Sequence, residues 1–233
     1  MASRRVRGFT LVEVLVALSV MALIAILSVN AIGGMSTTQS VTRDRSERLL
    51  RLQAALGQWN ADLDAVVDTG EVAPLDFNGQ ALRLTRRDSV DNPLESRGLR
   101  VVAWARVGTG ADAVWMRWQS GPVVRRDELA RAWQRAADWA RGSLLTPGET
   151  AGNPAADSAI RLVPVADWQV FFHRGDGWSN PQSSAPRGPL PGLVLDSGKM
   201  PNGVRLVLGL PTAEGLGGTI TRDWVRPSLE AGL

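Results

Sequence analysis

Few side chains in this sequence are of the types that carry out catalysis. The chain has one histidine, His173, and no cysteine, so a cysteine–histidine pair is impossible and a histidine-rich zinc site is excluded. His173 ends an apolar run beside a turn, where a hydrogen-bonded or solvent-facing histidine is the simplest interpretation. Acidic pairs such as Asp62/Asp64 and Asp88/Asp91 could bind calcium, but no spaced loop of oxygen ligands accompanies them. We therefore expect a protein that is not an enzyme, with no metal and no cofactor.

Glu13 is the one charged residue between Arg7 and Arg43, and it lies in an apolar run. Phe9–Val29 comprises 21 residues. As a helix this run is about 31 Å long, enough to cross a bilayer core of about 30 Å. A carboxylate in a membrane helix costs roughly 2.5–3.5 kcal/mol and needs a partner. The sequence predicts a membrane-spanning helix whose glutamate either has a partner or lies near the interface and reaches toward water.

A basic leader comes directly before the apolar run. Three arginines within residues 4–7 precede Gly8 and Phe9. A secretory signal is cut after its apolar core, whereas the only small-residue junction here, Gly8-Phe9, precedes the core. Cleavage there would leave the helix on the mature protein, with Glu13 as its fifth residue. The arginines predict a cytoplasmic N-terminus and a C-terminal body on the other side, in the periplasm of a diderm bacterium.

Residues 7–18, Arg-Gly-Phe-Thr-Leu-Val-Glu-Val-Leu-Val-Ala-Leu, resemble the class III signal of type IV pilins and pseudopilins. The resemblance implies that a prepilin peptidase cuts between Gly8 and Phe9 and methylates the new amine of Phe9. It also implies that Glu13 pairs with the terminal amine of a neighbouring subunit. Because a desolvated charge is tolerated when it is matched, Glu13 would be costly in a lone subunit and satisfied in an assembly.

A second helical pattern follows Gly33-Gly34, which is an expected flexible point. An apolar stripe with spacings of three and four residues predicts an amphipathic helix from about Ser36 to Val67 that ends near Gly70. Charged residues, among them Asp62, fill its other faces. The stripe consists of Leu49, Leu52, Leu56, Trp59, Leu63 and Val66.

From Val72 onward, short strand-like runs between turn residues predict a β-rich body with one further helix. That helix is expected from Asp127-Glu128 to Gly142, with a strand beginning at Val123 as the alternative. Residues 146–157 and 180–191 are expected to be irregular. The predicted strands are Ala81–Thr85, Leu99–Val107, Ala113–Gln119, Ile160–Val165, Trp168–His173, Gly203–Leu210 and Gly218–Val225.

The fold class expected from these patterns and the resemblance is α+β and type IV pilin-like. A long N-terminal helix, half in the membrane and half amphipathic, packs on a mainly antiparallel β head. The expected parts are a basic leader that is removed (1–8), a transmembrane helix (9–32), its amphipathic continuation (33–70), a periplasmic β-rich head (71–227) and a frayed tail (228–233).

Composition adds two constraints. The 26 basic residues are interspersed with 23 acidic ones and the net charge is +3, so no nucleic-acid partner is expected. The chain has nine tryptophans and no tyrosine. Most should be core residues, because indole buries a large apolar area. Trp178, in a Gly-Asp-Gly-Trp-Ser turn, is the expected exposed one and the candidate partner contact.

Chain length, the Arg-rich helix with Leu-Gln-Ala-Ala-Leu and a hydrophobic strand pair near the C-terminus resemble the J-type minor pseudopilins of the type II secretion system. Glu13 counts against the K type, which lacks it. The resemblance implies a structural component of the pseudopilus tip that initiates assembly and serves protein secretion across the outer membrane. The implied partners are I-type and K-type subunits, the prepilin peptidase, the inner-membrane assembly platform and membrane lipid.

Two alternatives stay open from the sequence. One is a minor pilin of a type IV pilus or DNA-uptake system, which shares the N-terminus. The other is a membrane-anchored periplasmic enzyme with a pilin-like signal by chance.

Overall fold

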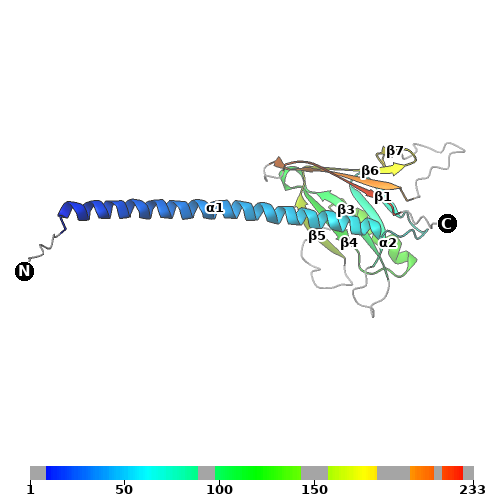
Figure 1. The fold of residues 1–233 in the computed structure, drawn as a ribbon. Helices are drawn as coiled ribbons and strands as arrows, with labels where there is room; N and C mark the ends of the chain where they lie inside the picture. Colours follow the sequence, from blue (N-terminus) through cyan, green and yellow to red (C-terminus); the bar gives the residue numbers. More distant parts are fainter. Residues whose placement is uncertain (1–8, 89–97, 143–156, 183–199, 213–216, 228–233) are drawn as a thin grey trace, which may run out of the picture. The chain divides into compact units, whose positions relative to one another are not determined.

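The structure, a computed structural model, describes residues 9–88, 98–142, 157–182, 200–212 and 217–227, with the backbone alone described for 31–38. The chain divides into two compact units, Met1–Arg48 and Leu49–Leu233. The second unit, which we call the head, holds every strand and the second helix (Figure 1).

Helix α1, Leu11–Asp64, begins in the first unit and ends in the head. It is 54 residues long, and Gly33-Gly34, the expected flexible point, lies inside it. Every side chain from residue 11 to residue 30 is exposed, so the apolar residues surround the helix on all sides. A helix that is apolar all round requires an apolar environment on all sides, in a core or in lipid.

Within the head, α1 has one apolar face. Leu52, Ala55, Trp59 and Leu63 are buried at spacings of three and four residues, which confirms the amphipathic pattern between Leu52 and Leu63. At the two ends of the predicted stripe, Leu49 is exposed and Val66 lies beyond the helix. The residues of α1 from Leu49 to Asp64, about four turns, therefore belong to the head.

Helix α1 ends at Asp64, short of the predicted end near Gly70. The chain after it joins a sheet, because the Val67 amide donates to the carbonyl of Thr85 at 2.9 Å. The Arg87 amide donates to the carbonyl of Ala65 at 3.0 Å. These backbone bonds replace the next helical turn.

Five antiparallel strands form the first sheet, in the order β1-β2-β3-β4-β5. Its order follows the chain, as in a meander. The bounds are β1 Leu75–Phe77, β2 Ala81–Arg87, β3 Leu99–Val107, β4 Val114–Gln119 and β5 Ser158–Pro164. A short 3-10 helix, η1 Gly110–Asp112, precedes β4.

Four antiparallel strands form the second sheet, in the order β7-β6-β8-β9. The bounds are β6 Asp167–Arg174, β7 Gly177–Ser179, β8 Gly203–Leu210 and β9 Gly218–Val225. The predicted antiparallel α+β head is therefore confirmed for the described residues.

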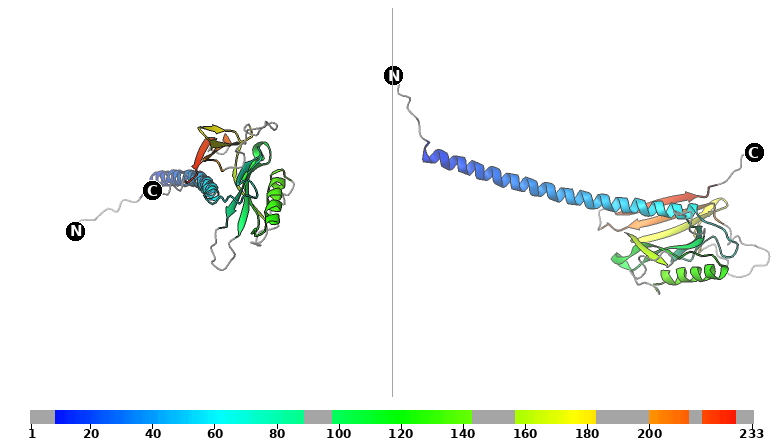
Figure 2. Two further views of the ribbon diagram at one scale, coloured as in Figure 1. Left: turned by 90° about the vertical axis from the view of Figure 1, so that its right-hand side faces the viewer. Right: turned by 90° about the horizontal axis from the view of Figure 1, so that it is seen from below.

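Two apolar clusters hold the head together. The larger one lies between the two sheets and α1, and includes Trp59, Trp104 and Leu206. The smaller one lies between the first sheet and α2, Arg126–Ala140, and includes Val101 and Leu129. Figure 2 shows α2 against one face of the first sheet, with the second sheet on the other face. The first sheet is thus covered on both faces.

The sequence predicted β3, β8 and β9 with the bounds that the structure has, and α2 as a helix. The alternative strand at Val123 is wrong, since Val123 forms only an isolated bridge with Leu99. The sequence missed β1 and β7, each of three residues, because a run that short carries no periodic signal. The segments expected to be irregular and the expected tail lie largely outside the described residues.

Candidate functional site

The apolar part of α1 meets the length of a membrane span. Leu11–Asn30 is a 20-residue stretch long and apolar enough to cross a bilayer. Its two serines satisfy their own hydroxyls, since Ser19 donates to the Leu15 carbonyl and Ser28 to the Ile24 carbonyl, both at 2.8 Å. Glu13 is the single ionisable side chain of the stretch.

Thr10 and Glu13 form a reciprocal cap at the start of α1. The Thr10 amide and hydroxyl both donate to Oε2 of Glu13, at 2.9 and 3.0 Å. The Glu13 amide donates in turn to Oγ1 of Thr10 at 3.3 Å. A Thr-x-x-Glu box of this kind satisfies amides that the first turn of a helix leaves unpaired. The same residues that form the sequence motif therefore also start the helix.

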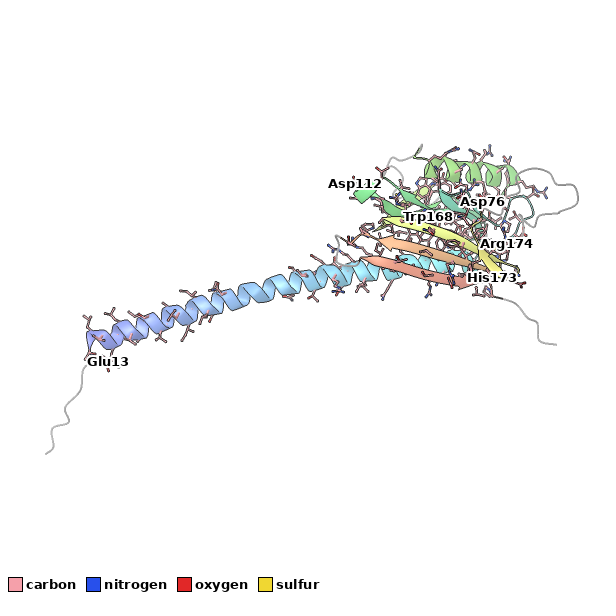
Figure 3. All side chains as sticks on the ribbon, turned by 90° about the horizontal axis from the view of Figure 1, so that it is seen from above. Glu13, Asp76, Asp112, Trp168, His173 and Arg174 are labelled. Atoms are coloured by element: carbon pink, nitrogen blue, oxygen red, sulfur yellow. The ribbon has the colours of Figure 1, made fainter. Side chains whose placement is uncertain are left out.

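Of the two predicted processing residues, the structure describes Phe9 but not Gly8. Phe9 is 87% exposed, immediately before the cap. Gly8 lies outside the described residues. Figure 3 labels Glu13 in the first turn of α1. Phe9 is therefore exposed directly before a capped helix start.

Asp62 is the main residue whose place the sequence did not reveal. The sequence put it on a face of α1 away from the apolar stripe, and this is wrong, because its carboxylate is 0% exposed. Asp62 lies at the margin of the buried face, where the head packs closely enough to enclose it. Its neighbour Asp64 is exposed and accepts a hydrogen bond from Trp224 at 2.7 Å.

Two arginines and a tryptophan from three strands meet at Asp62. Arg117 of β4 donates to both carboxylate oxygens, with Nε at 2.7 Å from Oδ2 and Nη2 at 2.9 Å from Oδ1. Arg86 of β2 donates to Oδ1 at 2.5 Å, and Trp104 of β3 donates to Oδ2 at 2.9 Å. Gln58, one turn earlier on α1, adds a bond of 3.0 Å. We call Asp62, Arg86, Arg117 and Trp104 the Asp62 clamp.

Trp178 is half-buried, rather than fully exposed as expected, and it is held on three sides. Its ring and that of His173 form a T-shaped pair with centroids 5.2 Å apart, and the guanidinium of Arg205 lies 4.3 Å from the Trp178 centroid. Arg205 is itself fixed by two bonds to Asp223, at 2.7 and 2.6 Å. The ring also lies over Gly203, where a β-carbon would come within 3.2 Å of it. Trp178 is therefore a preorganised aromatic group on the outer face of the second sheet.

The acidic residues weighed as metal ligands have other partners. Asp62 binds the two arginines, and Asp88 pairs with Arg100 at 2.8 Å. Asp91 lies outside the described residues. His173, labelled in Figure 3, lies one residue before the end of β6. Its ring packs against that of Trp178. In the described part of the chain, no group of three or more His, Cys, Asp or Glu side chains has the arrangement of a metal site.

Comparison with known proteins agrees with the sequence motif. Residues 3–29 match the family model described as the prokaryotic N-terminal methylation motif. Type II secretion system protein J of Vibrio cholerae is 26% identical over 190 residues, which cover 74% of this chain and 72% of that protein. Type II secretion system protein J of Klebsiella pneumoniae is 36% identical over 64 residues, 28% of this chain and 32% of that protein.

Among solved structures, the fold is similar to a chain of the GspK–GspI–GspJ complex of the type 2 secretion system from enterotoxigenic Escherichia coli. The TM-score is 0.46 and the sequence identity 16%, over 78% of this chain and 99% of that one. The methylation motif fits both the secretion and the pilus hypotheses, whereas the alignment with protein J over about three quarters of the chain favours secretion. The chain is therefore similar to type II secretion system protein J, in its methylation motif and along about three quarters of its length.

Proposed function

We propose that this protein is a structural subunit of the pseudopilus tip, where it initiates assembly together with I-type and K-type minor pseudopilins and so supports protein secretion across the outer membrane. The observation that carries the proposal is Glu13. It is a capped carboxylate in an apolar stretch of α1 whose side chains are otherwise un-ionised and exposed on every side. Such a helix needs both lipid and a counter-charge.

Processing supplies the counter-charge. A prepilin peptidase cuts between Gly8 and Phe9 and methylates Phe9, so the mature chain begins one residue before the Thr10 cap. The new amine is cationic, and a matching amine on a neighbouring subunit meets Glu13 in the assembly. The basic leader (1–8) is lost, and the transmembrane helix (9–32) stays on the protein.

The cap leaves part of Glu13 available for that partner. Both donors of Thr10 bind Oε2. Within the described part of the chain, Oε1 accepts no hydrogen bond. One oxygen is therefore oriented by the subunit's own helix, while the other is free to accept an N–H from another subunit. Thr10 thus holds the Glu13 carboxylate in the orientation that the partner would meet.

Topology follows from the arginines before the span. The N-terminus is cytoplasmic, the helix crosses the inner membrane once, and the head lies in the periplasm. On the head, Trp178 is the proposed partner contact, since an aromatic ring already held by Arg205 and His173 loses little side-chain entropy on binding. The amphipathic continuation (33–70) connects the span to the periplasmic β-rich part of the head (71–227), which the tail (228–233) follows.

The test is capture of I-type and K-type subunits by the full-length chain, co-expressed with the prepilin peptidase in a membrane. Glu13→Gln keeps the shape and removes the charge. We expect normal insertion and at least about a tenfold loss of captured subunits, a change of 1.4 kcal/mol or more. The control is Glu47→Gln, which removes an exposed glutamate paired with Arg43 on the same helix. Capture by Glu13→Gln at the level of the unaltered chain would contradict the proposal.

A further inference from the structure

Apolar packing by itself does not fix the rotation of α1 on the head. The buried face of the helix consists of Leu52, Ala55, Trp59 and Leu63. Burial of apolar surface is non-directional and roughly proportional to area. A helix turned by a fraction of a turn, or shifted along its axis, still buries much of the same surface.

The Asp62 clamp supplies the missing direction. The planar guanidinium of Arg117 binds both carboxylate oxygens, a geometry that tolerates little displacement. Arg86 and Trp104 approach the same carboxylate from two other strands. If α1 moved, Arg86 and Arg117 would stay buried, at 9% and 7% exposure, without their anion. Breaking a buried ion pair in this way is strongly unfavourable.

The rotation also decides which side of α1 remains accessible. Leu50, Gly57 and Ala61 lie on the side of the helix opposite Leu52 and Trp59, and all three are exposed. A β-carbon added to Gly57 would meet nothing within 4 Å. A rotated helix would present a different set of side chains to a neighbouring subunit.

We propose that Asp62 is a positioning residue, whose clamp by Arg86 and Arg117 sets the rotation of α1 on the head and thereby the helix face offered to partner pseudopilins. The second half of this inference rests on the proposed function. A buried ion pair is a poor source of net stability, and apolar side chains of similar volume often replace one without loss. The clamp therefore contributes a unique orientation rather than added stability.

The experiment separates orientation from stability. The triple variant Asp62→Leu, Arg86→Met, Arg117→Met replaces the clamp by apolar side chains in the full-length chain. The control Asp88→Leu, Arg100→Met removes another largely buried pair beside the first sheet. Three readouts are taken: the melting temperature, the near-ultraviolet circular dichroism and the amount of captured I-type and K-type subunits.

The tryptophan cluster reports the rotation when all spectra are compared in a Trp104→Phe background, because Trp104 itself donates to Asp62 and would respond to its loss. Trp59 lies on α1, and its ring centroid is 5.6 Å from that of Trp115 on the first sheet. Coupled indole bands depend on this distance and on the angle between the rings. A turn of the helix changes them even when the head stays folded.

We expect the triple variant to melt within a few degrees of the unaltered chain, with an altered indole spectrum and at least a fivefold loss of captured subunits. The control should change neither the spectrum nor the capture. An unchanged spectrum, or unchanged capture despite an altered spectrum, would overturn the inference. A triple variant that fails to fold would also overturn it, because the clamp would then serve stability itself. If the unaltered chain captures no pseudopilin, the proposed function fails, while the spectrum still tests the rotation.

Discussion

The indole N–H of Trp224 donates to the carboxylate of Asp64 at 2.7 Å and ties the closing strand to the end of α1. Trp224 is 6% exposed, so this bond forms at the edge of the core. Trp224→Phe keeps an aromatic ring and removes the donor. We expect a loss of about 1–2 kcal/mol in the free energy of unfolding, the usual cost of an unsatisfied group. Urea unfolding of the full-length protein in detergent measures it.

Asp64→Asn is the matched control for this bond. The amide keeps an oxygen acceptor for Trp224, so the loss of stability should be smaller than in Trp224→Phe. A Trp224→Phe variant as stable as the unaltered chain would show that the bond contributes nothing.

Thr10 should matter through its hydroxyl. Thr10→Val keeps the shape and loses the donor to Glu13, whereas Thr10→Ser keeps it. Loss of an N-cap hydroxyl weakens a helix start by about 1 kcal/mol. We expect Thr10→Val to capture fewer partner subunits than Thr10→Ser, which should behave as the unaltered chain. Equal capture by the two variants would mean that the cap does not orient Glu13.

Asp62→Ala tests the clamp by leaving Arg86 and Arg117 without their anion. Removal of one partner from a buried ion pair costs about 3–5 kcal/mol. The measurement is the shift in the urea midpoint at constant slope. The control Asp112→Ala removes an exposed carboxylate of the same charge and should leave the midpoint nearly unchanged. A small shift for Asp62→Ala would show that water reaches the arginines.

The pair Arg205–Asp223 predicts a dependence on pH. Hydrogen bonds from Arg205 lower the pKa of Asp223 below its usual value, against a small opposing effect of desolvation. A carboxyl whose pKa is lowered by folding stabilises the native state above its unfolded pKa, about 3.9, and loses this contribution as pH falls through the folded pKa. The contribution is small, because the pair is exposed to solvent.

The difference in urea midpoint between the unaltered chain and Asp223→Asn should therefore be constant from pH 5 to pH 8 and shrink below about pH 4. The fluorescence of Trp178 should change with it, since Arg205 would lose its anchor over the ring. A difference that persists or grows at pH 3 would argue against this pairing.

The sequence was most informative where the signal is local. The apolar stretch and the alternation in β8 each lie within one short segment, and both have the structure that was predicted. The cap between Thr10 and Glu13 is equally local, but it was not predicted from the sequence. The burial of Asp62, in contrast, depends on contacts between distant parts of the sequence. Its cations come from positions 24 and 55 residues away, so no window along the chain contains the pattern. Trp178 was expected to be exposed but is half-buried, because its support by Arg205 depends on strand register, which the sequence does not specify.

The measurement that tests the central claim most directly is the intact mass and N-terminal sequence of the full-length chain, expressed with and without a prepilin peptidase. With the peptidase, we predict a mature chain that begins at Phe9 and carries one added methyl group. Without it, the leader should remain. A chain that stays uncut in the presence of the peptidase, or that is cut after the apolar stretch, would contradict the account.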